Sequence, residues 1–365
     1  PILAEFAGGE RWARPAGHPN EVVACLSGTD TDGNVWPGCG DYRVDVTGGW
    51  YDAGDHGKYV VNGGISVWTL QNLYEVEQAR TKGKGTFAKA GKLVPDQGRL
   101  DPLLVETRWQ MEFMLKMQVA DGIRMQLPIN QQPGPGLVLS EVDASGMAHH
   151  KMGDRNWTGL PMRPHDDPEE RLLYPPSTAA TLNLAATAAQ CARLWRDVDR
   201  AFADRCLQAA QRAYAAAKRN PAIYSANFNG SGGYGDPELA DEFYWAAAEL
   251  AVTTGDAGYR ADLAASPIVS KGYSEPSWGD TAALGAMTLA LQGSADQGSE
   301  AKRIIGLADD YLAQQERTGY FIPFDSLDYP WGSNSTLLNR AMLLGVAHRL
   351  TGEARYLDGM RNVMD

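Results

Sequence analysis

The sequence predicts an all-α fold in which pairs of helices follow one another around a toroid with long loops. Helical periodicity dominates the 365 residues, and alternating β-branched runs are scarce. A helix–turn–helix pattern also recurs, in residues 248–263 and 346–360 and more weakly in residues 191–206. Hairpins repeated about every fifty residues favour a toroid with an apolar inner ring. The alternative, a superhelical solenoid, fits less well because the intervening loops are long and irregular.

The helices are placed by their apolar spacing and by the signals at their ends. Gly255 and Gly352 are suited to end a helix in the left-handed conformation. Asp256 and Glu353 follow them and suit the positive N-terminus of the next helix. The main strand candidate is residues 42–50. The expected helices are residues 63–80, 101–119, 176–195, 199–218, 237–254, 280–292, 300–315 and 335–350.

Three stretches between these helices lack periodicity, namely residues 121–175, 221–236 and 264–279. Long loops of this kind in compact domains are usually functional, and here we expect them to form a cleft. Because no low-complexity linker divides the chain, we predict a single domain over residues 1–365. The chain begins abruptly and stops inside a helical pattern, so we expect this domain to be incomplete at both ends.

Composition excludes several classes of partner. The net charge is −12 and there is no cluster of Lys and Arg with interleaved aromatics, so we expect no nucleic-acid partner. No apolar run approaches the ~20 residues needed to span a bilayer, so we expect no membrane association. The ten Trp and fifteen Tyr include rings suited to stacking on sugars, although most aromatic side chains belong to the core.

The stretch "GGWYDAGDHGKYV", residues 48–60, places Asp52 and Asp55 three residues apart among glycines and aromatics. Gly54 and Gly57 allow sharp turns, so both carboxylates can point into one cavity. Glycoside hydrolysis with inversion needs such a carboxylate to take a proton from water, while a separate acid protonates the leaving oxygen. A second aspartate can hold the water or raise the pKa of the base. The alternative is a pair of structural Asx turns.

The four cysteines are of two kinds. Cys191 and Cys206 lie in alanine-rich helical runs, and we expect them to be free, buried thiols. Cys25 and Cys39 flank a polar, turn-rich loop and fit either a disulfide or part of a zinc site. A disulfide implies an oxidising compartment, whereas neither cysteine has a histidine within five residues to complete a zinc site.

A cluster of acidic residues follows the glycine-rich segment "SGGYG". Hard oxygen ligands in a flexible loop are what Ca²⁺ prefers. The alternative is that these acids only favour the N-terminus of the next helix. The acids are Asp236, Glu238, Asp241 and Glu242.

The segment "DVTGGWYDAGDHGKYVVNG" closely resembles the signature of family 9 glycoside hydrolases. That family consists mostly of cellulases with an (α/α)6 barrel. Further stretches agree in order along nearly the whole chain, and the likeness is greatest to members with an immunoglobulin-like module before the barrel. These stretches are "EFMLKMQ", "HHKM…W…P", "PPSTAATLNLAA", "DEFYWAAAEL" and "WGSNSTLLNRAM".

The resemblance implies that Asp55 is the general base and that Asp52 helps to hold the nucleophilic water. In the family, the catalytic acid is a Glu in an "NEVA"-like segment near the C-terminus of the domain. This chain stops before that segment, so the resemblance names no acid here. An "NEV" run at residues 20–22 precedes the aspartates, and we interpret its Glu21 as a solvated loop residue.

The resemblance also bears on metals. Some relatives bind structural zinc through two Cys and two His, but the histidine positions are Gly40 and Tyr51 in this chain. We therefore expect no zinc at this place and favour a Cys25–Cys39 disulfide. Some family members carry a similar Ser-Gly…Asp-Glu calcium site, which favours calcium here. Its predicted ligands are Asp241 and Glu242, with Asp236 and Asp280 as further candidates.

For the substrate, the resemblance points to the stretch that begins at His150 and includes Trp157, which matches a segment lining the family's cleft. Trp331, in "YPWGSNS", matches a sugar-stacking position, and Trp278, in "SWGD", is a further candidate. A ring lying on a pyranose supplies apolar contact, and a histidine can donate to hydroxyls. Each of these side chains could instead be ordinary packing.

These inferences predict a secreted or periplasmic, monomeric endo-β-1,4-glucanase that hydrolyses cellulose-like chains or cello-oligosaccharides with inversion and needs no cofactor for chemistry. The first alternative is an exo-acting relative on the same fold, a cellobiohydrolase or an exo-β-glucosaminidase. The second alternative, from another class, is a glycan-binding protein that kept the barrel and lost its chemistry.

Overall fold

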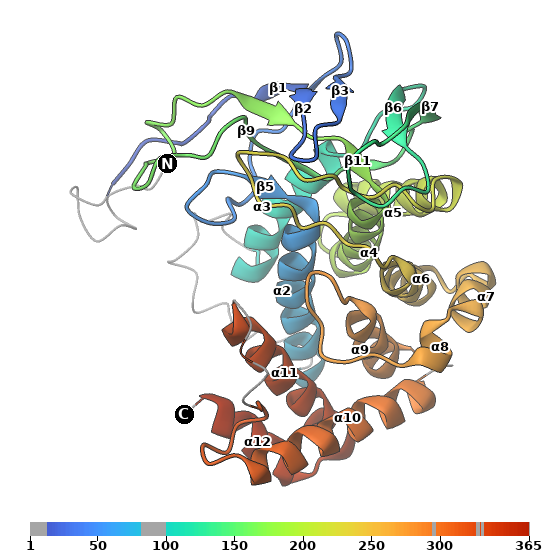
Figure 1. Ribbon diagram of the computed structural model, residues 1–365. Coiled ribbons are helices and arrows are strands. Elements are labelled where there is room, and N and C mark those ends of the chain that lie inside the picture. The colour runs from blue at the N-terminus through green and yellow to red at the C-terminus, as the bar shows by residue number, and fades with distance from the viewer. Residues whose placement is uncertain (1–12, 82–99, 294–296, 326–328, 330–331, 365) are drawn as a thin grey trace. The chain divides into compact units, whose positions relative to one another are not determined.

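The computed structural model describes residues 13–81, 100–293, 297–325, 329 and 332–364 (Figure 1). The chain divides into two compact units, an N-terminal unit, Pro1–Leu239, and a C-terminal unit, Ala240–Asp365. The single domain predicted over residues 1–365 stays a prediction. Within the described ranges, no helix is both long enough and apolar enough to cross a bilayer.

Helices α3 (Pro102–Lys116), α4 (Thr178–Trp195) and α5 (Arg200–Arg219) of the N-terminal unit begin at polar caps, which satisfy backbone N–H groups of the first turn. The side chains of Asp101, Ser177 and Asp199 each accept a hydrogen bond from a backbone N–H in the first turn that follows. The four helices in the described part of this unit overlap those predicted from the sequence. They are α2 (Val60–Thr81), α3, α4 and α5.

Helix α4 is the centre of this unit. Its alanines and threonines are buried on all sides, which explains why it lacks a polar face. Polar contacts also join α4 to α2. Gln71 Nε2 donates to Gln190 Oε1 at 3.2 Å, and Arg193 Nε donates to Glu75 Oε1 at 2.7 Å. Small side chains and paired polar groups therefore let the two helices pack closely.

The strands of the N-terminal unit are more numerous than the sequence analysis expected. One of them, β4, lies within the predicted strand region of residues 42–50, but residues 121–175 contain five more. Each strand has only two to five residues, so alternation is too short to stand out. They are β1 (Val22–Cys25), β2 (Ser27–Thr29), β3 (Val35–Pro37), β4 (Arg43–Asp45), β5 (Lys58–Tyr59), β6 (Arg124–Pro128), β7 (Leu139–Asp143), β8 (Ala148–His149), β9 (Lys151–Asp154), β10 (Arg171–Leu173) and β11 (Pro176–Ser177).

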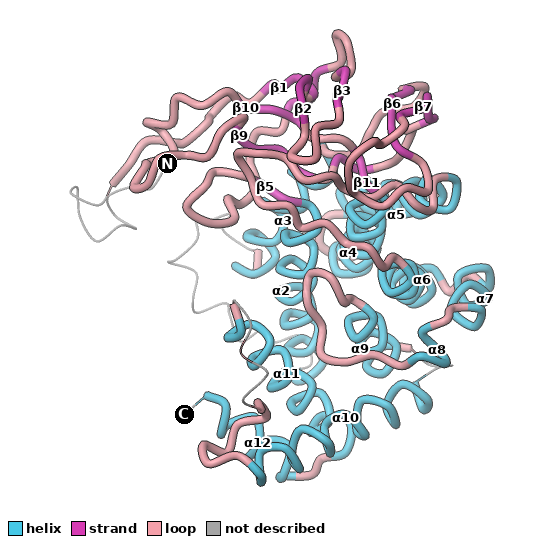
Figure 2. Tube along the Cα trace, viewed as in Figure 1, coloured by secondary structure: helices cyan, strands magenta, loops and turns pink. Residues whose placement is uncertain are grey.

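Five of these strands form a mixed sheet in the order β4-β1-β10-β9-β5. Strands β1 and β10 are parallel and the other pairs are antiparallel. Strand β5 runs directly into α2, as Figure 2 shows. Its register pairs Lys58 with Met152 and Tyr59 with Lys151. The loop that carries the two aspartates thus ends at a sheet edge whose position is fixed by β9.

The C-terminal unit contains the helical hairpins that the repeat predicted. Gly255 and Gly352 follow α6 and α11 with φ of 74° and 77°, the left-handed conformation expected of them. Asp256 caps α7 by accepting a hydrogen bond from Gly258 N at 2.6 Å. The helices are α6 (Ala240–Thr254), α7 (Ala257–Ala265), α8 (Ile268–Lys271), α9 (Ala282–Gln292), α10 (Gln297–Arg317), α11 (Ser333–Thr351) and α12 (Ala354–Met364).

A disulfide joins Cys25, at the end of β1, to Cys39, beyond β3, across a Cα–Cα distance of 5.5 Å. It closes the loop that contains the β2–β3 hairpin, whose Trp36 is buried in the adjacent core. Cys191 and Cys206 are free and buried, as predicted. The disulfide therefore restrains a segment with little secondary structure of its own.

We expect the Cys25→Ser/Cys39→Ser double variant to lose about 3 kcal/mol of unfolding free energy, since a disulfide that closes a loop of ~15 residues restricts the unfolded chain by that amount. Denaturant unfolding followed by circular dichroism measures the loss. Dithiothreitol should destabilise the unmodified chain equally and leave the double variant unchanged. Equal unfolding midpoints for the chain and the double variant would contradict the prediction.

Candidate active site

The loop between β4 and β5 presents Asp52 and Asp55. A hydrogen bond from Asp52 N to Gly57 O at 3.0 Å closes the part of the loop that carries both aspartates. Gly57 is required by close approach, because a Cβ there would lie 2.7 Å from Asp55 Oδ2 and 2.6 Å from the Tyr59 hydroxyl. The sequence analysis expected Gly54 and Gly57 to make sharp turns. Gly54 lies in a bend over residues 53–55, and the left-handed residues of the loop are Gly48 and Gly49.

Three side chains donate hydrogen bonds to the two carboxylates. Tyr234 donates to Asp52 Oδ2 at 2.6 Å, and Asn62 Nδ2 donates to Asp52 Oδ1. Tyr59 donates to Asp55 Oδ2 at 2.9 Å, the same oxygen that accepts from the Gly57 N–H. Both oxygens of Asp52 therefore accept hydrogen bonds, whereas the two hydrogen bonds that Asp55 accepts from described residues fall on a single oxygen.

Burial is the main influence on the pKa of Asp52, Tyr59 and Tyr234. It raises the pKa of Asp52, to which the neighbouring charge of Asp55 adds, while the hydrogen bonds from Tyr234 and Asn62 act in the opposite direction. Burial and the adjacent carboxylates also raise the pKa of Tyr59 and Tyr234. Both phenols thus stay protonated near neutral pH and remain hydrogen-bond donors to the aspartates.

Asp52 opens into a pocket of about 230 Å³ at the start of α2. The pocket combines one carboxylate with aromatic rings and amide side chains, the mixture that a sugar ring requires. It is lined by Trp50, Tyr51, Asp52, Tyr59, Asn62, Gly63, Ser66 and Gln110.

A second layer of buried polar groups supports the donors. Gly232 N donates to the Tyr59 hydroxyl at 2.7 Å, and Lys151 Nζ donates to Gly232 O. His150 Nε2 donates to Gly233 O at 3.0 Å, and its Nδ1 lies 2.7 Å from the Ser177 hydroxyl. Strand β9 and the residue before it therefore hold the backbone just before Tyr234.

Burial lowers the pKa of the two supporting side chains, His150 and Lys151. Burial lowers the pKa of His150 to about 3, so the ring is neutral and donates through Nε2 alone. Burial also lowers the pKa of Lys151 to about 7, against the opposing effect of the Asp55 charge. His150 was predicted to bind a sugar hydroxyl. It is 1% exposed with both ring nitrogens engaged in the protein, and its role as a sugar ligand stays a prediction.

Buried charges anchor the other side of the loop. Lys58 Nζ donates to Glu21 and to the carbonyl oxygens of Val46 and Gly48, at 2.6 and 2.8 Å for the carbonyls. Arg171 Nε donates to the other oxygen of Glu21 at 3.0 Å. The interpretation of Glu21 as a solvated loop residue is therefore wrong, because it is 4% exposed and forms ion pairs with two buried cations.

Arg171 completes this buried cluster. Its Nη1 donates to Asp154 Oδ1 at 2.6 Å and its Nη2 donates to His56 O at 2.7 Å. Burial lowers the pKa of Lys58 to about 8, while Glu21 favours the charged form. The loop that carries the aspartates is thus tied by its backbone to a cluster with matched charges.

Comparison with known proteins identifies the family. The profile of Glycosyl hydrolase family 9 matches residues 4–365. The chain belongs to glycosyl hydrolase family 9. The resemblance of residues 45–63 to the signature of this family is confirmed.

Two curated relatives are similar over almost all of this family 9 chain. Cellulose 1,4-beta-cellobiosidase from Acetivibrio thermocellus is 41% identical over 411 residues, covering 100% of this chain and 43% of that protein. Endoglucanase C from Cellulomonas fimi is 42% identical over 371 residues, covering 95% of this chain and 31% of that protein. The chain therefore spans less than half the length of either relative.

A solved structure shows the fold. The crystal structure of a metagenome-derived glycoside hydrolase family 9 endoglucanase is 30% identical and superposes with a TM-score of 0.79. The match covers 96% of this chain and 59% of that chain. The predicted fold class, an all-α (α/α)6 barrel, is confirmed.

The structure describes two of the three tryptophans predicted to bind sugars in this family 9 chain. Trp157 follows β9 in the N-terminal unit and is 54% exposed. Trp278 lies between α8 and α9 in the C-terminal unit and is 38% exposed. Trp331 lies outside the described residues. Trp157 and Trp278 have the exposure that a stacking surface needs, and all three assignments stay predictions.

The acidic residues predicted to bind calcium belong to both units. In the C-terminal unit, Asp241 and Glu242 are buried in the first turn of α6, and Asp241 Oδ2 accepts from Thr281 N at 2.7 Å. Burial and the charge of Asp241 raise the pKa of Asp280 to about 6. Asp236 is buried in the N-terminal unit and accepts a hydrogen bond from Glu238 N at 2.9 Å.

The zinc site of some family 9 relatives does not fit this chain. The two cysteines form a disulfide and so offer no thiolate. Gly40 has no side chain to offer, and the Tyr51 hydroxyl is hydrogen-bonded to His18 Nδ1 at 2.7 Å. The ligand set of that site is therefore absent from these four positions.

The sequence analysis did not single out the donors to the aspartates. Tyr59 and Asn62 stand inside the quoted signature of the family, and Tyr234 stands in the glycine-rich segment before the predicted calcium ligands. For Tyr59 and Asn62, the available signal was an aromatic and an amide residue close in sequence to a carboxylate pair. What was missing was the contact between Tyr234 and Asp52, which are 182 positions apart.

We expect Glu21→Gln to destabilise the chain by about 3–5 kcal/mol, because it removes the charge that pairs with the buried Lys58 and Arg171. The matched control is Glu141→Gln, which breaks an exposed ion pair with Arg124 and should cost about 1 kcal/mol or less. Urea unfolding measures both. Equal losses for the two variants would contradict the interpretation of Glu21 as a buried anchor.

Proposed function

We propose that this chain carries the catalytic base of an inverting endo-β-1,4-glucanase that acts on cellulose-like chains or cello-oligosaccharides. The observation that carries the proposal is the pair Asp52 and Asp55 on one loop, with the donors Tyr59, Asn62 and Tyr234 fixing their orientation. Such a pair serves a reaction in which a water must be both held and deprotonated.

The two aspartates differ in the way that the reaction needs. Asp55 accepts both of its hydrogen bonds on Oδ2, which leaves Oδ1 to take a proton from the attacking water. Asp52 accepts on both oxygens and opens into the pocket. We therefore assign the general base to Asp55 and the positioning of the water to Asp52.

Inversion also needs a carboxylic acid across the scissile bond, about 6.5–9.5 Å from the base, to protonate the leaving oxygen. No residue of this chain is proposed for that role. The residues assigned here account for the positioning and deprotonation of the attacking water. The aromatic rings of the pocket supply apolar surface for a sugar ring.

The mode of attack has two candidates. Endoglucanase C supports internal cleavage, while the cellobiosidase of A. thermocellus, similar to nearly the same degree, supports release of cellobiose from chain ends. An exo-β-glucosaminidase is the second exo-acting candidate. Viscosity and reducing ends measured together on a soluble glucan distinguish the modes, because internal cuts lower viscosity early. Slow viscosity loss with steady cellobiose release would replace the endo assignment by the exo one.

We also propose a structural calcium ion at Asp241, Glu242 and Asp280. Buried carboxylates are hard oxygen ligands, and a divalent cation offsets the burial and the neighbouring Asp241 charge that raise the pKa of Asp280. No cofactor for chemistry is proposed. The Cys25–Cys39 disulfide supports a secreted or periplasmic location, and a monomer is the proposed state.

We expect Asp55→Ala, made in the full-length polypeptide, to abolish hydrolysis while leaving the affinity for cello-oligosaccharides nearly unchanged, because the base acts on water rather than on the sugar. Reducing-sugar release and calorimetric titration measure the two effects, and proton NMR of the first product reports inversion. Asp32→Ala, at an exposed aspartate, is the control.

Two results would decide against this assignment. Full activity of Asp55→Ala would remove Asp55 from the role of base. Binding of cello-oligosaccharides by the unmodified polypeptide without any hydrolysis would instead support the non-catalytic glycan-binding alternative.

We expect Tyr59→Phe and Tyr234→Phe each to lower kcat by about 10- to 100-fold, since a hydrogen bond to a charged group is worth about 1.5–3 kcal/mol. Each variant loses one donor to an aspartate and keeps the ring. Tyr320→Phe, at an 86% exposed tyrosine, should retain full activity. Unchanged kcat in both site variants would mean that the phenols do not orient the aspartates.

A further inference from the structure

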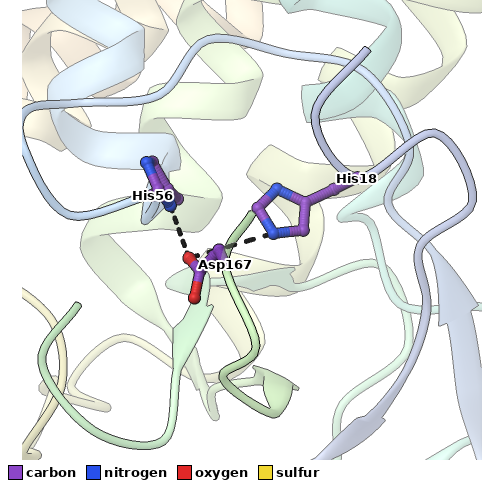
Figure 3. Close-up of side chains that lie close together, drawn as sticks. All are labelled: His18, His56 and Asp167. Carbon is purple, nitrogen blue, oxygen red and sulfur yellow. Dashed lines mark hydrogen bonds and ion pairs between the residues drawn. The ribbon is translucent and has the colours of Figure 1, made fainter. Parts of the chain in front are cut away.

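A second group of potential ligands lies beside the aspartate loop. His18, His56 and Asp167 come from three separate segments: the chain before β1, the aspartate loop, and the chain before β10. One atom of each side chain lies within 4.8 Å of the other two. Figure 3 shows both imidazole rings turned toward the carboxylate of Asp167. None of the three takes part in the hydrogen bonds that orient Asp52 and Asp55.

One ring nitrogen of His18 is available to bind a metal ion. Its Nδ1 lies 2.7 Å from the Tyr51 hydroxyl. Its Nε2 is buried, has no hydrogen-bond partner within the described part of the chain, and lies 3.9 Å from Asp167 Oδ2. The His18 side chain is 10% exposed. A buried nitrogen that faces a carboxylate at a distance too long for a hydrogen bond leaves room for a cation between the two atoms.

The spacing fits a metal ion better than a hydrogen bond. Ligands bound to zinc at ~2.0–2.1 Å lie roughly 3.3 Å apart in a tetrahedral site and at most about 4.1 Å apart. The 3.9 Å between His18 Nε2 and Asp167 Oδ2 is about 0.6 Å longer than the tetrahedral spacing, so these two side chains would move slightly closer together on binding the metal. His56 Nδ1 is hydrogen-bonded to the same Asp167 oxygen, so it needs only to exchange that contact for the metal.

Second contacts hold these ligands in place, as at established metal sites. Tyr51 fixes the ring of His18, and Asp167 Oδ1 accepts a hydrogen bond from Glu169 N at 3.1 Å, which directs Oδ2 toward the histidines. The Asp167 side chain is completely buried. The three ligand atoms are therefore oriented before a metal binds.

The surrounding charges permit a cation. Two positive groups lie nearby, Lys58 and Arg171, and Arg171 donates to the His56 carbonyl. Each is already paired, because Glu21 accepts from both and Asp154 accepts from Arg171. The charge of Asp167 is left over once these pairs are counted, and this carboxylate would attract a divalent ion.

We propose that His18, His56 and Asp167 form a zinc site in which water supplies the fourth ligand. Two imidazole nitrogens and one carboxylate are a ligand set suited to Zn²⁺ rather than to Ca²⁺ or Mg²⁺. His18 and Tyr51 also line a pocket of about 370 Å³, from which the water reaches the ion. This site is distinct from the Cys and His positions of the relatives' zinc site and does not depend on the proposed glucanase activity.

The consequence for the fold is a cross-link between three loops. A metal bound to His56 would fix the residue next to Asp55 to the chain before β1 and to the chain before β10. Zinc would thus stabilise the loop that presents the aspartates without touching them.

The experiment is zinc binding by the full-length polypeptide, with 1 mM calcium present to saturate oxygen-rich sites. We expect about one zinc per chain by elemental analysis after dialysis, and a thermal midpoint that rises with free zinc. Competition with a chromophoric chelator gives the affinity. His18→Gln should weaken binding by more than ~100-fold, and Tyr51→Phe, which removes only a supporting contact, by about tenfold. His348→Gln, in the C-terminal unit, is the matched control and should bind like the unmodified polypeptide.

Cobalt(II) gives a second readout, because a tetrahedral site with nitrogen ligands produces visible d–d absorption that His18→Gln should lose. Asp167→Asn should lose it too, and if that variant does not fold, the result with His18→Gln decides. Failure of the unmodified polypeptide to retain zinc would overturn the proposal and leave a hydrogen-bonded His–Asp–His group. Equal zinc affinity in His18→Gln and the unmodified polypeptide would overturn it as well.

Discussion

The buried carboxylate of Glu21 is the constraint on which the N-terminal unit depends. It accepts hydrogen bonds from Lys58 and Arg171, which stand on β5 and β10 of the same sheet. A lysine and an arginine inside a protein are tolerated only when each is paired. Because Lys58 also donates to the carbonyl oxygens of Val46 and Gly48, this one carboxylate fixes both ends of the aspartate loop.

The chemistry of the candidate site is built on a second set of buried polar groups. Lys151 and His150 hold the carbonyl oxygens of Gly232 and Gly233, and the Tyr59 hydroxyl accepts from Gly232 N. These hydrogen bonds fix the backbone before Tyr234 and the hydroxyl of Tyr59, and so hold the two tyrosines that donate to Asp52 and Asp55. Orientation of carboxylates to this degree is what acid–base chemistry on a single water requires.

Sequence reasoning was most accurate where the signal is local. The predicted helices, the left-handed Gly255 and Gly352, the cap at Asp256 and the buried free cysteines all depend on a few neighbouring residues. It was wrong for Glu21, whose place in a polar run next to a proline resembles an exposed loop. It also missed most of the strands, because two to five residues are too few to show a period.

The sequence by itself determined the helical fold class, the family and the loop that carries Asp52 and Asp55, since each is written in contiguous residues. Only the tertiary structure decided which groups surround that loop. Tyr234 reaches Asp52 across 182 positions, Arg171 reaches Glu21 across 150, and Asp167 reaches His56 across 111. No local pattern encodes such pairings, because they follow from how sheet and helices bring distant segments together and from the need of every buried charge for a partner.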